Sequence, residues 1–128
     1  ELAGAVLAGA SLRAANLRGT SLPGADLGHA RLDGADLSEC VLQKASFMRA
    51  VARGARFDKA DLTDAVLATA DLMMASFMNA TIRGADLRGT NLYGADMARV
   101  RSDAHVRLEG AVLVKVRVHP IHTPGGSR

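Results

Sequence analysis

The chain has 128 residues, the length of a single domain, and a formal net charge of +3. Aromatic residues make up 3% of it, too few for a wide globular core. No apolar run reaches the roughly 20 residues that span a bilayer, so we expect no membrane partner. The single cysteine, Cys40, forms no intrachain disulfide and is compatible with a reducing compartment, for which we expect the bacterial cytoplasm.

A five-residue unit repeats without interruption from Leu2 to Met97. Its centre is a large apolar residue everywhere except at Ala52, and Ala usually stands two residues before the centre. A period of five matches neither the 3.6 residues of a helix nor the two of a strand. Two inward-facing residues in every five, one small and one large, predict a solenoid with a corner in each repeat.

Glycine stands two residues after many of the centres. It adopts the positive φ that a type II turn requires without steric cost, so it suits a corner. Between residues 39 and 79, eight corners carry another residue at this position, and there we predict a different turn geometry. They are Glu39, Lys44, Arg49, Lys59, Asp64, Thr69, Met74 and Asn79.

Segments such as Ala15-Asn16-Leu17-Arg18-Gly19 and Ala85-Asp86-Leu87-Arg88-Gly89 resemble the pentapeptide-repeat family, whose pattern is A(D/N)LXX. The resemblance implies an all-β fold, a right-handed quadrilateral β-helix with four repeats per coil and about six coils. Residues twenty apart would then stack. Phe57 should lie on Phe77, and the rings of Phe47 and Phe57 should fill the space that Ala52 leaves between them.

The sequence predicts three regions. Residues 1–100 form the β-helix, residues 101–118 form a frame-shifted terminal coil or cap, and residues 119–128 form a flexible tail. The shift is visible at the next centres, Leu108 and Leu113, because one extra residue precedes them. Two histidines in the tail are too few ligands to predict a metal site.

Four valines alternate with other residues at the end of the second region. They are Val112, Val114, Val116 and Val118. This alternation predicts a β strand that covers the apolar end of the last coil. As an alternative, the strand pairs with its copy in a second chain and forms a homodimer.

An outward-facing cluster is the candidate interaction patch. It consists of Met73, Met74, Met78 and Tyr93. Exposed thioethers beside an aromatic ring are typical of adaptable contact surfaces. The alternative is that the chain's own tail covers them.

Asp or Asn precedes many centres and could be mistaken for a set of catalytic carboxylates. These residues are Asn16, Asp26, Asp36, Asp61, Asp71, Asp86, Asn91 and Asp96. Their recurrence at every corner instead indicates hydrogen bonds to nearby backbone amides. We therefore assign no catalytic, metal-binding or cofactor-binding residue and expect no enzyme and no cofactor.

The sequence favours a non-catalytic scaffold that binds another protein. Residues 90–101, together with residues 107–111 and 118–120, also resemble the end of pentapeptide domains encoded with bacterial type VI secretion systems. That resemblance implies an accessory or effector-loading role within a larger bacterial protein.

The family also suggests an alternative, a DNA mimic of the quinolone-resistance type that binds DNA gyrase. Such mimicry requires an acidic face, whereas residues 1–100 carry eleven Lys or Arg and eleven Asp or Glu. Arg56 and Ser76 also interrupt the column of Asn16, Asp36 and Asp96. Direct nucleic-acid binding is disfavoured because the basic residues of the C-terminal part are not interleaved with aromatic ones.

Overall fold

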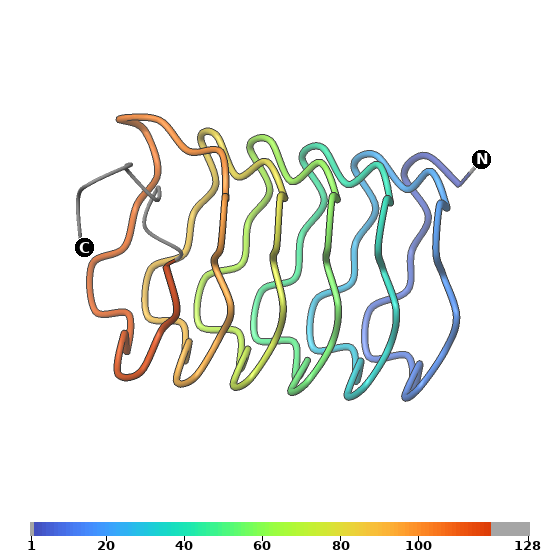
Figure 1. Ribbon diagram of the computed structural model, residues 1–128. Helices are drawn as coiled ribbons and strands as arrows, with labels where there is room; N and C mark the ends of the chain where they lie inside the picture. The colour runs from blue at the N-terminus through green and yellow to red at the C-terminus, as the bar shows by residue number, and fades with distance from the viewer. Residues whose placement is uncertain (1, 119–128) are drawn as a thin grey trace.

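The computed structural model describes residues 2–118. Over this range the chain has no helix and winds into coils that follow one another along a single axis, from the blue end to the red end of Figure 1. Each side of a coil contributes one residue to a parallel β-bridge, and a two-residue turn follows at each corner. The expected all-β quadrilateral β-helix is confirmed.

The four sides form four ladders of bridged residues, here called faces 1 to 4. Face 1 runs through Val6, Asp26, Ser46, Val66, Asp86 and Arg107; face 2 through Ser11, Arg31, Val51, Asp71, Asn91 and Val112; face 3 through Asn16, Asp36, Arg56, Ser76, Asp96 and Arg117; and face 4 through Ser21, Val41, Asp61, Thr81 and Arg101. The distance in sequence between bridged residues is constant up to Arg101 and becomes one residue longer at Arg107. The bridges thus confirm an inserted residue between these two positions.

Backbone hydrogen bonds between coils repeat in the same pattern at each side. The Leu62 amide donates to the Thr81 carbonyl at 2.7 Å, and the Asp61 amide donates to the Cys40 carbonyl at 3.0 Å. Within the corner, the Ala65 amide donates to the Leu62 carbonyl at 3.0 Å. Each interior coil is therefore bonded on both edges, which fixes its register against its neighbours.

The axis is filled by alternating columns of small and large side chains that exclude solvent. The rings of Phe57 and Phe77 stack with their centroids 4.9 Å apart and their planes 4° apart. Phe47 meets Phe57 edge to face at 5.6 Å, across the space where Ala52 replaces a larger residue. All four side chains are completely buried. The predicted stacking and the predicted compensation of volume are both confirmed.

The sequence predicted a different turn geometry at the corners where another residue replaces glycine. For the backbone angle φ, this prediction is wrong. Glu39, Thr69 and Met74 have φ of 61°, 59° and 61°, in the same left-handed region as glycines such as Gly24 at 67°. Each corner amide is bonded to the next coil; the Met74 amide, for example, donates to the Tyr93 carbonyl at 2.8 Å. Interlocking with two neighbouring coils holds these residues in a conformation that costs a non-glycine residue roughly 1–2 kcal/mol.

The prediction of one continuous strand through the four C-terminal valines is also wrong. The chain bends at Val114 and Lys115, where Lys115 has φ of 58°. Val112 bridges to Asn91 on face 2, and Arg117 bridges to Asp96 on face 3. The segment therefore forms two sides of a further coil, and within residues 2–118 it does not fold across the end of the axis.

The inserted residue lies in a loop that Asp103 ties to the preceding coil. Its carboxylate accepts hydrogen bonds from the amide of Gly84 at 3.1 Å and from the amide of His105 at 3.0 Å. The bond from Gly84, with that from His105, holds the pKa of Asp103 below its ordinary value. Where the frame changes, the Asp103 carboxylate thus accepts the hydrogen bond that a backbone carbonyl of the next coil accepts at the regular corners.

We expect this loop to loosen as the pH falls. Because the pKa of Asp103 is lower in the folded chain than its unfolded value of about 3.9, the two bonds contribute fully above that value and are lost as pH falls through the folded pKa. Hydrogen exchange of the Gly84 and His105 amides, measured by NMR, should lose its protection below about pH 4. Asp103→Ala should remove this protection at every pH; protection that is unchanged in this variant would contradict the assignment.

Candidate functional site

The regularly spaced Asp and Asn residues are engaged in turns, as the sequence predicts. Each of them accepts a hydrogen bond from the amide two residues further on, at 2.9–3.3 Å. These bonds join Asn16 to Arg18, Asp26 to Gly28, Asp36 to Ser38, Asp61 to Thr63, Asp71 to Met73, Asp86 to Arg88, Asn91 to Tyr93 and Asp96 to Ala98. The geometry gives these side chains a structural role at the corners.

The remaining chemistry-bearing groups are dispersed. Among the residues that the structure describes, no group of three His, Cys, Asp or Glu side chains could hold a metal ion. The Cys40 thiol donates a hydrogen bond to the Leu17 carbonyl at 2.9 Å, and burial raises its pKa, so it remains a protonated, structural thiol. Over the same part of the chain, there is no helix of the length and apolarity that a membrane span requires.

The candidate patch is divided between two corners. Met73 and Met74 lie at the same corner as Tyr93, one coil earlier. The hydrogen bond from the Met74 amide to the Tyr93 carbonyl shows this position. Met78 lies at the following corner, where its amide donates to the Asp58 carboxylate at 3.1 Å. Met73, Met74 and Tyr93 are therefore neighbours, whereas Met78 belongs to another surface.

The corner of Met73 and Met74 continues through Tyr93 into the last coil, where Val114 and Lys115 complete it. These five residues are called the Met–Tyr corner. The Lys115 Nζ lies 6.0 Å from the centroid of the Tyr93 ring, which is a cation–π distance. Met74 is 59% exposed, and its sulfur lies against the backbone of Gly94, where a side chain would collide with it. The result is a continuous ridge of thioethers, ring and aliphatic surface.

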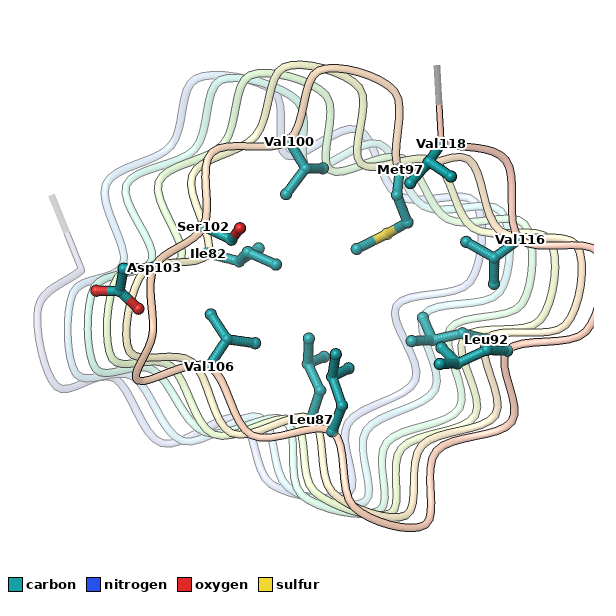
Figure 2. Close-up of a pocket in the computed structure, with 12 residues that line it drawn as sticks. Ile82, Leu87, Leu92, Met97, Val100, Ser102, Asp103, Val106, Val116 and Val118 are labelled. Carbon is teal, nitrogen blue, oxygen red and sulfur yellow. The ribbon is translucent and has the colours of Figure 1, made fainter. Parts of the chain in front are cut away.

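A cavity of about 490 Å³ lies at the C-terminal end of the axis. Figure 2 looks along the axis into this end and shows apolar side chains pointing toward the shared centre. The lining includes Leu87, Leu92, Met97, Val106, Leu113 and Val116. Asp103 also borders the cavity but directs its carboxylate away from the centre (Figure 2).

Comparison with known families decides the identity of the fold. A family model described as pentapeptide repeats matches residues 1–38, 30–67 and 75–101, with eight copies. The chain belongs to the pentapeptide-repeat family. No match was found among curated protein sequences.

Solved pentapeptide-repeat structures resemble this pentapeptide-repeat protein over most of its length. One from the thylakoid lumen of Arabidopsis thaliana is 34% identical over 73% of this chain, with a TM-score of 0.61. This chain spans 61% of the length of that protein. Rfr23 from the cyanobacterium Cyanothece 51142 is 22% identical, with 92% and 86% of the two chains covered and a TM-score of 0.63. HetL from Nostoc, involved in the regulation of heterocyst differentiation, is 19% identical, with 91% and 88% covered and a TM-score of 0.57.

Two features of this pentapeptide-repeat protein escaped the sequence analysis. Val114 and Lys115 belong to the Met–Tyr corner, although the alternation of valines placed them in a strand. The signal that finds them is the stacking distance, since Val114 follows Tyr93 by one coil plus the inserted residue. The cavity was also missed, because the sequence predicted that the last valines would cover it. His119 and His122 lie outside the described residues.

Proposed function

We propose that this pentapeptide-repeat protein is a non-catalytic scaffold that binds another protein through the Met–Tyr corner. The observation that supports the proposal most directly is the exposure of Met74 beside Tyr93 on a rigid backbone. Exposed Met and aromatic side chains contribute adaptable apolar contacts, and a stacked corner holds them without loss of backbone entropy on binding. The cation of Lys115 on the Tyr93 ring restricts the aromatic side chain further.

The mixed charges of face 3 give less support to the alternative function, that of a DNA mimic. The face carries the carboxylates of Asp36 and Asp96, but Arg56 and Arg117 stand in the same ladder. The Arg56 guanidinium also lies 3.3 Å from the Asp58 carboxylate at the adjoining corner. A surface that imitates the phosphates of DNA needs an uninterrupted row of negative charge, and this face alternates in sign.

Replacement of the two thioethers of the Met–Tyr corner should test the scaffold proposal. Met73→Ser/Met74→Ser removes both thioethers of the corner and should reduce partner recovery at least tenfold, while the free energy of unfolding changes by no more than about 1 kcal/mol. Affinity capture from native cells, with quantitative mass spectrometry, measures the recovery, and urea unfolding followed by circular dichroism measures the stability.

The matched control is Met48→Ser/Met78→Ser, which removes two exposed methionines from other corners. This variant should recover the same proteins as the unmodified chain. Equal recovery by the two double variants would remove the Met–Tyr corner as a binding surface.

A further inference from the structure

The C-terminal end of the axis is an apolar opening. Leu92 is 1% exposed, whereas Leu113, its counterpart one coil later, is 49% exposed, and Leu108 and Val118 are exposed at the same end. These three side chains border the cavity. We call this opening the C-terminal mouth. Its apolar lining favours a ligand that inserts at least one apolar side chain.

The rim of the mouth also presents a backbone edge. One coil earlier, the Leu87 amide donates to the Arg107 carbonyl at 2.8 Å, and the Ala85 carbonyl accepts from the Arg107 amide at 3.1 Å. The equivalent groups in the last coil, the Leu108 amide and the Val106 carbonyl, have no backbone partner between residues 2 and 118. A row of such groups pairs with an added strand. An extended peptide satisfies this edge, whereas a lipid or a small apolar molecule does not.

Positive charge surrounds the mouth. Residues 2–80 carry eight basic and eight acidic side chains, whereas residues 81–118 carry seven basic and four acidic ones. In each ion pair between residues 2 and 118, the basic partner is Arg88 or a residue before it in the sequence. The cations of the last coil therefore form no ion pair within this range. These are Arg101, Arg107, Lys115 and Arg117. All four are exposed, so the complementary ligand is acidic.

The same charges argue against occupants supplied by this chain. Two C-terminal mouths facing each other would bring their arginines together. The first coil offers little compensation in a head-to-tail contact, because its charged residues are Arg13, Arg18 and the single acidic Glu1. The sequence of residues 119–128 contains Arg128 and no acidic residue. The ends of a second copy and residues 119–128 thus both lack the excess of negative charge that the rim would attract.

We infer that the C-terminal mouth binds an extended acidic segment of a partner protein. The segment adds a strand to the last coil, inserts an apolar side chain between Leu108 and Leu113, and places its carboxylates near Arg107 and Arg117. This site lies at the end of the axis, apart from the thioethers of Met73 and Met74, and does not depend on the function proposed for that corner.

The test uses the full chain and a fluorescein-labelled twelve-residue peptide in which Glu alternates with Leu or Val. Fluorescence anisotropy should show saturable binding that weakens as salt is added. Leu113→Glu places a carboxylate in the mouth and should weaken binding at least tenfold. Leu2→Glu is the matched control, because Leu2 is equally exposed at the opposite end, and should bind as the unmodified chain does.

Charge reversal separates the rim from the cavity. Arg107→Glu/Arg117→Glu should also weaken binding at least tenfold, while Arg49→Glu, on an exposed corner of the third coil, should have no effect. A peptide with Lys in place of Glu should not bind. Together these results would support the site, provided that circular dichroism shows each variant folded.

Other outcomes would overturn the inference. Equal affinity of the Leu113→Glu and Leu2→Glu variants would place the peptide elsewhere. Binding that appears only after Ile121→Asp would show that the tail occupies the mouth. A concentration-dependent dimer that Leu113→Glu dissociates, without peptide binding by the unmodified chain, would identify a second copy as the occupant.

Discussion

Phe57→Ala is expected to lower the free energy of unfolding by about 3–5 kcal/mol, the cost of removing a large buried ring. The ring is completely buried, stacks on Phe77 at 4.9 Å and meets the edge of Phe47 at 5.6 Å. Both neighbours lose their contact at once, and coils bonded on both edges have little freedom to collapse into the space. Urea unfolding followed by circular dichroism measures the change.

The neighbouring Ala52 provides a sharper form of this test. Ala52→Leu alone should cost about 1–3 kcal/mol, because the rings of Phe47 and Phe57 already fill the space beside it. Combined with Phe57→Leu, the same substitution recreates the ordinary Leu pattern and should cost much less than the sum of the two single changes. Additive losses would contradict the compensation of volume across this coil.

Deletion of the single residue Lys59 is expected to be more damaging than deletion of the twenty residues 59–78. Lys59 is exposed, and Lys59→Ala should change the stability by less than about 0.5 kcal/mol. Deleting it shifts the frame between two coils that are fixed on both edges, since its amide donates to the Met78 carbonyl at 2.9 Å. A loss of more than about 5 kcal/mol, or of cooperative unfolding, should follow.

Deletion of residues 59–78 removes one complete coil and joins positions that are equivalent in the stack. This shorter solenoid should keep the circular dichroism spectrum of the unmodified chain and unfold cooperatively, because each coil contacts only its neighbours. Circular dichroism and urea unfolding of both deletions measure the difference. A stable fold after deletion of Lys59 would show that an interior corner accepts a change of frame as readily as the loop at Asp103 does.

The repeat period predicted the direction of each side chain but not its position around the coil. Leu and Phe centres such as Phe57 and Phe77 stack as expected, because a strict five-residue frame makes residues twenty apart equivalent. Met74 and Met78 both point outward, yet they lie on different corners, and that distinction requires counting repeats around the coil. The candidate patch therefore combined residues of two different corners.

The other misses arise where the context of the stack overrides a local pattern. Residues such as Thr69 disfavour a left-handed φ in isolation, but bonds to the adjacent coil hold it at 59°. The alternating valines from Val112 to Val118 fit the period of a strand, but continued stacking on Asn91 and Asp96 imposes a corner at Lys115. Local propensity could not reveal either outcome.

The Asp and Asn bonds at the corners have a consequence for sequence divergence. Each side chain bonds an amide only two residues away, so a turn is completed by its own repeat and makes no demand on the solvent-facing residues next to it. Those residues are free to change while the architecture persists. Rfr23 and HetL have the same fold at 22% and 19% identity to this chain. The surface can thus acquire new specificities one substitution at a time, without any adjustment of the interior.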